Sequence, residues 1–339
     1  MIAGFAQAGS ARSPMPGQAP VAILRGMSMT DRPAAEVRDA RPGAVIAAAG
    51  LTKAYGSQRG IVDVSFTVAA GEVFGFLGPN GAGKTTTIRL MLDLLRPTAG
   101  TVELFGLPPG DIAARRRVGY LPGDLRLYDR LTAREHARYF AHLRAMPDLG
   151  DAPELAERLG LEMDRPTRQL SRGNRQKVGV MLALMHRPEL LILDEPTGGL
   201  DPLVQQTFNQ ILHETTDGGG TVFLSSHVLS EVQHVADRVG VIRDGRLMLT
   251  ESVETLRIRA SRRVEARFAA APPADAFAGL EGASEISRDG DRVLFALHGE
   301  VDALLKRLAD YHVAALDSHE ADLEDVFLQM YSEGAADAA

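Results

Sequence analysis

Three short apolar runs in the middle of the chain predict buried strands. They occupy residues 73–77, 190–193 and 221–224, and glycine or polar residues follow each run directly. After the first run, apolar side chains recur at helical spacing, as at Ile88 and Met91. Apolar runs that alternate with helical patterns are typical of an α/β fold with a parallel sheet.

Shorter or alternating segments surround these runs. Residues 61–68 alternate between apolar and polar side chains, which indicates a strand with one buried face. An Asp244-Gly245 pair between two apolar segments predicts a hairpin. We expect these segments to add an antiparallel β part to the parallel core. The further expected strands are 49–56, 101–105, 118–122, 239–243 and 247–249.

Residues 124–168 read as a helical, charged insertion between two blocks of α/β pattern. Thr132 and Glu135 have the spacing of a capping box, which predicts a helix to about residue 144. A second helix is expected at residues 153–159. Because the α/β pattern resumes afterwards, we interpret the insertion as part of the larger domain.

From about Leu256 the pattern changes again, which predicts a smaller domain at residues 257–332. The βαββαβ order of its segments is that of a ferredoxin-like α+β domain. Its strands are expected near 263–268, 283–287, 291–297 and 312–316, and its helices near 273–279 and 300–310. A last amphipathic helix would carry Leu323, Val326, Phe327 and Met330.

The larger domain is expected at residues 44–256. Residues 1–43 are rich in Ala, Pro, Gly, Ser and Arg without a sustained period, which predicts a disordered extension. Met27 and Met29 lie within it, so the sequence leaves the true start open. A disordered tail is expected at residues 333–339.

The sequence Gly-Pro-Asn-Gly-Ala-Gly-Lys-Thr, residues 78–85, predicts a phosphate-binding loop. Its glycines permit conformations in which backbone N–H groups converge on a phosphate, beside a helix N-terminus. Lys84 would reach the β- and γ-phosphates, and the Thr85 hydroxyl would bind Mg²⁺. A plain glycine-rich turn is the alternative, but the complete motif between a strand and a helix favours a nucleotide site.

Polar side chains end the other two apolar runs. Asp194 could bind Mg²⁺ through water, and Glu195 could polarise the attacking water as a general base. The alternative is an acidic pair at the start of a helix. A lone histidine is more often structural, but His227 follows Ser225 and Ser226 at the end of the third strand, which favours a contact with a γ-phosphate. Tyr55 could stack on an adenine ring or serve only in packing.

Composition narrows the function classes. The 339 residues carry a formal net charge of −7, which gives no support to bulk nucleic-acid binding. The sequence has no cysteine, so disulfides and thiolate metal ligands are excluded. No apolar run approaches the roughly 18 residues that a membrane span needs. Any role at a membrane is therefore expected to be peripheral.

Taken together, these motifs resemble the nucleotide-binding subunits of ABC transporters over roughly residues 45–250. The matching motifs are Walker A at 78–85, Walker B at 190–195, the D-loop at 199–201, the switch histidine at His227 and the adenine-stacking aromatic at Tyr55. The resemblance implies a P-loop ABC-type ATPase core that binds ATP and Mg²⁺ and hydrolyses ATP.

The resemblance also assigns roles to individual residues. Catalysis would rest on Lys84, Glu195 and His227, and Mg²⁺ would be bound by Thr85 and Asp194. The residues expected to contact ATP are Tyr55, Gly78, Pro79, Asn80, Gly81, Ala82, Gly83, Lys84, Thr85, Thr86, Ser171, Gly173 and Asp201.

Two motifs depart from the family pattern. The signature, usually Leu-Ser-Gly-Gly-Gln, reads Leu-Ser-Arg-Gly-Asn at residues 170–174, so Ser171 and Gly173 are kept. In the family this motif binds the γ-phosphate held by the opposite subunit, which implies a dimer, expected to be a homodimer. Gly123 stands where the family often has a glutamine that touches Mg²⁺ and the membrane partner, and Asp124 is expected to be a turn or cap residue rather than a substitute ligand.

The resemblance further implies a separate transmembrane permease subunit and a location at the cytoplasmic face of the membrane. The signature and residues 319–328 look like those of bacterial drug and antibiotic export ATPases. A soluble ABC-type ATPase acting on nucleic acid or ribosomes is the alternative, but the chain has neither long coiled-coil heptads nor a second ATPase half. A regulatory GTPase would need an Asn-Lys-x-Asp motif, which is absent. The transported substrate and the membrane partner's identity stay open.

Overall fold

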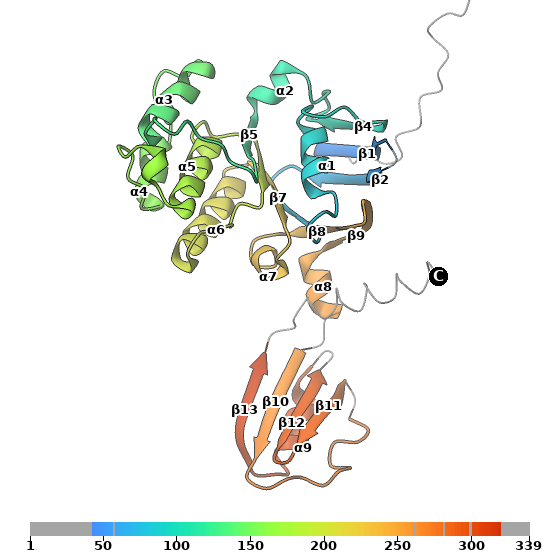
Figure 1. Ribbon diagram of the computed structural model, residues 1–339. Helices are drawn as coiled ribbons and strands as arrows, with labels where there is room; N and C mark the ends of the chain where they lie inside the picture. Colours follow the sequence, from blue (N-terminus) through green and yellow to red (C-terminus); the bar gives the residue numbers. More distant parts are fainter. Residues whose placement is uncertain (1–42, 57, 260–261, 281, 298–299, 320–339) are drawn as a thin grey trace, which may run out of the picture. The chain divides into compact units, whose positions relative to one another are not determined.

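Three β-sheets organise the chain, of which the computed structural model describes residues 43–319 except 57, 260–261, 281 and 298–299 (Figure 1). The expectations for residues 1–42 and 320–339 lie outside the described residues. The largest sheet has the order β5-β6-β7-β3-β8-β9, and all its pairs are parallel except β8 with β9. Its strands are β3 (Val73–Leu77), β5 (Val118–Leu121), β6 (Leu190–Asp194), β7 (Thr221–Ser226), β8 (Arg238–Arg243) and β9 (Arg246–Ser252).

The central strands are buried on both faces, as their continuous apolar runs predict. In β6, Leu191 and Leu193 enter the core that α5 and α6 cover, whereas Leu190 and Ile192 enter the core around α1. Alternate side chains of one strand thus stabilise two layers. The helices of this part are α1 (Lys84–Met91), α2 (Ile112–Arg116), α3 (Ala133–Leu143), α4 (Ala152–Arg158), α5 (Arg172–Leu184), α6 (Pro202–Asp217), α7 (Leu229–Val232) and α8 (Val253–Arg259), with a 3₁₀ turn at Thr167–Gln169.

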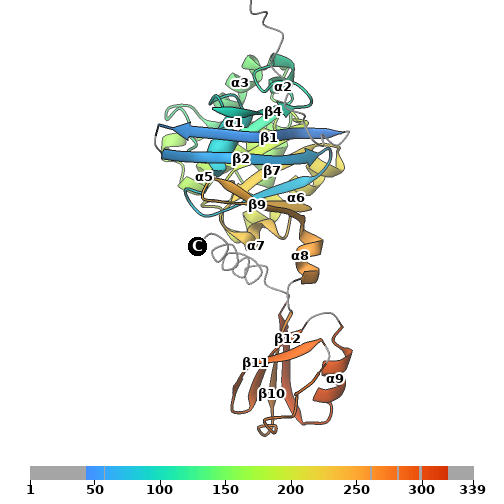
Figure 2. The same ribbon diagram turned by 90° about the vertical axis from the view of Figure 1, so that its right-hand side faces the viewer.

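The expected antiparallel part is a three-stranded sheet of order β2-β1-β4, which faces the viewer in Figure 2. It packs on the central sheet through an aromatic cluster in which Phe66 lies 5.6–5.9 Å from the rings of Phe74, Phe76 and Phe223. Ring contacts at this spacing add to the burial of large apolar surfaces. The strands are β1 (Ala44–Tyr55), β2 (Gln58–Ala69) and β4 (Ala99–Leu104).

The helical insertion forms as predicted. The Thr132 hydroxyl accepts from the Glu135 N–H and the Glu135 carboxylate accepts from the Thr132 N–H, so the capping box is complete. Small residues on the inner face of α3, such as Ala137, let it approach the core cluster shared with α4 and α5. The five-residue helix α2 was not expected, because the N-cap residue Asp111 is its only local signal in the sequence.

The C-terminal segments form a four-stranded antiparallel sheet of order β11-β12-β10-β13, the order of a ferredoxin-like fold. The helix expected at 273–279 is wrong: residues 274–279 are turns. Pro272 and Pro273 remove two backbone donors there, yet Phe277 still packs edge-on against Phe295, with ring centroids 4.9 Å apart. The elements are β10 (Arg262–Phe268), β11 (Ala283–Asp289), β12 (Arg292–Leu297), α9 (Asp302–Leu308) and β13 (Val313–His319).

The position expected for the domain boundary falls inside α8, because this helix runs from Val253 to Arg259. Val253 and Leu256 are buried in the core of the larger part. The start of a separate domain at residue 257 stays a prediction.

His186, just after α5, is a buried titratable group of this fold. Its Nε2 lies 3.2 Å from the Val118 carbonyl oxygen, and its Nδ1 has no hydrogen-bond partner within the described residues. Burial, together with the positive charge of Arg144, lowers the pKa of His186 from 6.5 to about 4. The folded chain therefore holds this ring neutral in mildly acidic solution.

This lowered pKa predicts a pH dependence of stability. Between pH 6.5 and pH 4 the unfolded chain binds a proton at His186 and the folded chain does not, so the free energy of unfolding falls as the pH falls. We expect wild type to lose about 1–2 kcal/mol more than His186→Gln between pH 7 and pH 4.5, after allowance for solvent screening. Urea unfolding measures it, with exposed His142→Gln as the control. Parallel curves for wild type and His186→Gln would contradict the prediction.

Candidate nucleotide-binding site

The phosphate-binding loop connects β3 to α1, as its flanking pattern predicts. Gly78 and Gly83 have no room for a side chain: an added Cβ would lie 2.3 Å from the Ile242 carbonyl oxygen at Gly78 and 2.5 Å from Ile61 Cγ2 at Gly83. Gly83 also has a φ of +112°, which non-glycine residues rarely adopt. These constraints let the loop close tightly over the end of β3.

Lys84 is held inside this loop. Its side chain is 5% exposed, and Nζ donates to the carbonyl oxygens of Gly78 at 2.7 Å and Pro79 at 3.2 Å. The same nitrogen lies 3.2 Å from Glu195 Oε1. The loop thus presents one buried cation beside the carboxylate that is the candidate general base.

Asp194 lies at the end of β6 with both carboxylate oxygens in use. Oδ2 accepts from the Thr85 hydroxyl at 2.9 Å, and Oδ1 accepts from the Ser225 hydroxyl at 2.6 Å. A hydroxyl and a carboxylate in contact are oxygen ligands that suit Mg²⁺, which keeps several waters and takes few protein ligands. Thr85 and Asp194 therefore fit the predicted magnesium site.

Glu195 contacts both other candidate catalytic residues. Its Oε2 lies 3.1 Å from His227 Nδ1, and its Oε1 faces Lys84. Its backbone has a φ of +51°, in the left-handed region that costs a non-glycine residue of order 1–3 kcal/mol. The Glu195 N–H donates to the carbonyl oxygen of Ser225 at 3.1 Å and to its hydroxyl oxygen at 3.2 Å. These hydrogen bonds hold Glu195 in this conformation.

A cavity of about 260 Å³ lies over the loop and contains most of the predicted ATP contacts. Tyr55, the last residue of β1, lies at its edge with 44% of its surface exposed. A Cβ at Gly60 would lie 2.8 Å from the Tyr55 ring, so the ring packs against this glycine. The lining residues are Tyr55, Gly60, Asn80, Gly81, Gly83, Lys84, Thr85, Thr86 and Glu195.

Gly78, Pro79 and Ala82 belong to the same loop but do not line the cavity, whereas Ser171, Gly173 and Asp201 form a second group outside it. Ser171 caps α5 and accepts from the Asn174 N–H, and Asp201 caps α6 and accepts from the Val204 N–H. The start of α5 touches the D-loop, because a Cβ at Gly173 would lie 2.4 Å from the Gly199 carbonyl oxygen. The structure thus divides the predicted ATP contacts into two groups within one chain.

Gly123, in the loop after β5, lies next to Asp194, and its expected lack of a magnesium ligand stays a prediction. An added Cβ at Gly123 would lie 3.3 Å from Asp194 Oδ2, so this position does face the candidate magnesium site without a side chain to offer. Asp124 points elsewhere: its Oδ2 accepts from Arg126 at 2.9 Å, and its side chain is 72% exposed.

Sequence reasoning missed several residues that support the site. Ser225 was recognised only as part of a polar strand end, yet its hydroxyl binds Asp194. Gln176, on α5, is buried and donates to the Pro196 carbonyl oxygen at 2.8 Å. Glu231, on α7, accepts from the hydroxyls of Thr197 and Ser226. None belongs to a motif, so only the folded arrangement identifies them.

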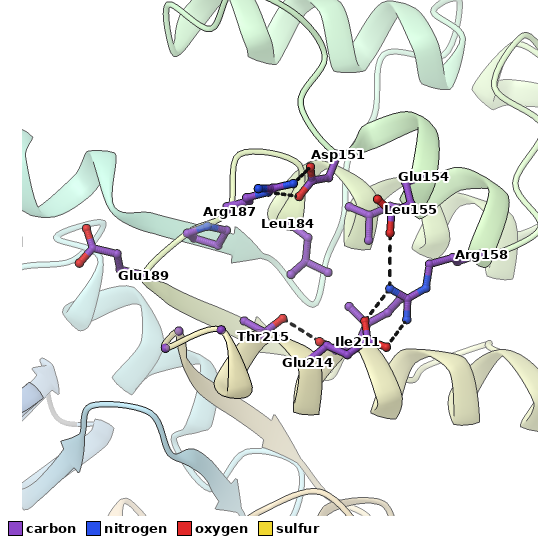
Figure 3. A pocket seen from close by; sticks show the side chains of 14 residues that line it. Asp151, Glu154, Leu155, Arg158, Leu184, Arg187, Glu189, Ile211, Glu214 and Thr215 are labelled. Atoms are coloured by element: carbon purple, nitrogen blue, oxygen red, sulfur yellow. Dashed lines mark hydrogen bonds and ion pairs between the residues drawn. The ribbon is translucent and has the colours of Figure 1, made fainter.

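Another cavity, of about 340 Å³, lies between α4, the end of α6 and the loop after α5 (Figure 3). Its charged side chains are already paired. Arg158 binds Glu214 through two bonds of 2.6 and 2.9 Å, and Arg187 binds Asp151 through two bonds of 2.6 and 2.8 Å. These pairs join the helical insertion to the core and leave no free cation for a triphosphate.

Comparisons with known proteins agree with this geometry. The family model described as ABC transporter matches residues 61–198. The bacitracin transport ATP-binding protein BcrA of Bacillus licheniformis is 40% identical over 209 residues, which cover 60% of this chain and 68% of that protein. The SkfA peptide export ATP-binding protein SkfE of Bacillus subtilis is 40% identical over 204 residues, 58% of this chain and 85% of that protein.

Solved structures agree on the fold. The solved structure of an ATP-binding subunit of an ABC transporter is similar to this chain, with 29% sequence identity and a TM-score of 0.60. The match covers 63% of this chain and 92% of that structure's chain. A bacterial ABC transporter cassette solved as a dimer is 23% identical, with a TM-score of 0.57, over 61% of this chain and 98% of its own. At 23% identity, the similarity to this second structure supports a shared fold and nothing more.

Lys84, which would bind phosphate, and Glu195, the candidate base, should respond differently to substitution. Lys84→Ala removes the phosphate cation and should abolish tight ATP binding. Glu195→Gln keeps the shape but not the base, so ATP should still bind while hydrolysis falls roughly 10²–10⁴-fold. Equilibrium binding of ATP and phosphate release measure the two effects. A Glu195→Gln protein that hydrolyses ATP at the wild-type rate would contradict the assignment of the base.

The exposed position of Asp124 predicts that it does not bind magnesium. Asp124→Ala should leave the Mg²⁺ concentration for half-maximal hydrolysis within about twofold of wild type, as for most surface substitutions. Asp194→Asn is the matched control and should raise that concentration. A collapse of magnesium affinity in folded Asp124→Ala would show that Asp124 is the substitute ligand.

Proposed function

Because this chain belongs to the family of ABC transporter ATP-binding proteins, we propose that it drives export through a separate membrane subunit. The family binds and hydrolyses ATP, and this chain is an ATPase of that type. Export is favoured by the relatives named for bacitracin transport and peptide export. In the described ranges, no helix is both long and apolar enough to cross a membrane. The proposed channel belongs to a partner at whose cytoplasmic face this chain binds.

The proposed reaction is in-line attack of water on the γ-phosphate. Lys84 and the N–H groups of the loop hold the phosphates, and charge stabilisation and positioning supply most of the catalysis in phosphoryl transfer. Glu195 accepts the proton of the attacking water, and His227, 3.1 Å from its carboxylate, orients it. Mg²⁺, bound by Thr85 and Asp194, would neutralise phosphate charge. Tyr55 would stack on the adenine ring.

We further propose that two copies enclose two ATP molecules. The main support is the separation of Ser171 and Gly173 from the cavity that contains Lys84 and Thr85. A hydroxyl and a tight glycine turn at the N-terminus of a thirteen-residue helix suit an anion, which a second copy would supply.

The sandwich predicts dimerisation that depends on ATP. Glu195→Gln, which should trap ATP, is expected to have the mass of two 36.4-kDa chains in Mg-ATP and of one chain without it, by light scattering. Adding Ser171→Asp keeps a good N-cap but places a negative charge opposite the phosphate, and should leave a monomer. A monomeric Glu195→Gln protein in saturating ATP, or dimerisation of the double variant, would contradict the proposal.

Co-purification tests the transport role itself. Full-length chain extracted from native membranes with mild detergent should carry along a multi-span membrane protein that stimulates its ATPase activity. Recovery of the chain with ribosomes or nucleic acid and no membrane protein would instead favour the soluble mechanical ATPase.

A further inference from the structure

Glu231 connects two loops that carry catalytic residues. It lies on α7, the short helix after His227, and is partly buried. Its Oε2 accepts from the Thr197 hydroxyl at 2.7 Å and from the Ser226 hydroxyl at 3.0 Å. Two donors therefore meet on a single carboxylate oxygen.

The two donors flank the candidate catalytic pair in the sequence. Thr197 follows Glu195 by two residues, and Ser226 directly precedes His227. Ser226 Oγ also accepts from the Val228 N–H at 2.9 Å, which fixes the turn with His227 at its centre. Glu231 thus ties the segment after the general base to the turn that carries the histidine.

The segment after Glu195 is fixed from its other side as well. Gln176 donates from α5 to the Pro196 carbonyl oxygen in a buried bond of 2.8 Å. Glu195 has a left-handed backbone, and a strained residue keeps such a conformation only when its surroundings over-determine it. Glu231 and Gln176 are the side chains that hold the two residues following it.

We propose that Glu231 is a positioning residue for ATP hydrolysis. It keeps the Glu195 and His227 segments at the separation where the carboxylate and imidazole lie 3.1 Å apart. It does not line the cavity over the phosphate-binding loop. Its two bonds need an acceptor oxygen rather than a charge. This inference rests on the proposed roles of Glu195 and His227.

The expected result is a loss of turnover without a loss of ATP affinity. In purified full-length chain, Glu231→Ala should lower kcat about 10- to 100-fold, since a misplacement of about 1 Å can cost that much, while the dissociation constant for ATP stays within about threefold. Glu231→Gln retains an acceptor oxygen and should recover kcat to within about threefold of wild type. Exposed Glu157→Ala, on α4, is the matched control and should match wild type.

Thr197→Val tests the bond from its other end. This substitution keeps the shape of threonine and removes the hydroxyl donor, so it should lower kcat in the wild-type background. In the Glu231→Ala background it should have no further effect, because the same bond between residues 197 and 231 is already broken. Wild-type kcat in Glu231→Ala, additive effects of the two changes, or equal defects in Glu231→Gln and Glu231→Ala would overturn the proposal. If Glu231→Ala does not fold, Thr197→Val and Glu231→Gln still decide it.

Glu195→Gln, measured in parallel, separates this inference from the function on which it rests. An active Glu195→Gln protein means that the assignment of the base fails and the proposal fails with it. An inactive Glu195→Gln protein beside a fully active Glu231→Ala protein refutes the positioning role alone.

Discussion

The parallel register of β3, β6 and β7 is the constraint on which the candidate site depends. Leu77 pairs with Ser226 and Asp194 pairs with Ser225, so all three strands end at the same edge. Segments about 110 residues apart in the chain, such as Thr85 and Asp194, therefore meet within hydrogen-bond distance. The strands end together because a one-residue shift would move every side chain of a strand into the opposite one of the two packed cores.

At this edge, hydrogen bonds decide where the carboxylates point. Asp194 is 2% exposed and would be costly to bury without its two hydroxyl donors. Glu195 is less enclosed, with 34% of its side chain exposed, and faces Lys84 and His227. Two adjacent carboxylates thus have separate environments, one bound by hydroxyls and suited to a cation, the other open to a reacting water.

Sequence patterns predicted the strands and the phosphate loop because their causes are local. Continuous apolar runs, the glycines of the loop and the capping box at Thr132 each specify structure within a few residues. The helix expected at 273–279 is wrong because this short segment makes isolated turn bonds, from the Ala276 N–H to the Pro273 oxygen and from the Ala278 N–H to the Asp275 oxygen. The support from Glu231 could not be predicted, since Thr197 lies 34 residues away and no local signal links them.

The buried bond between Gln176 and Pro196 gives the two groups of ATP contacts a mechanical connection. Gln176 lies on α5, whose first turn is capped by Ser171, and Pro196 directly follows Glu195. A shift of α5 must therefore move the segment after Glu195, the candidate general base, or leave a buried amide unpaired, which costs about 1–3 kcal/mol. Because the Gly173 backbone also touches Gly199, the start of α5 and the D-loop are restrained together. These contacts of Gln176 and Gly173 connect the start of α5 to the segment that follows Glu195 within the same chain.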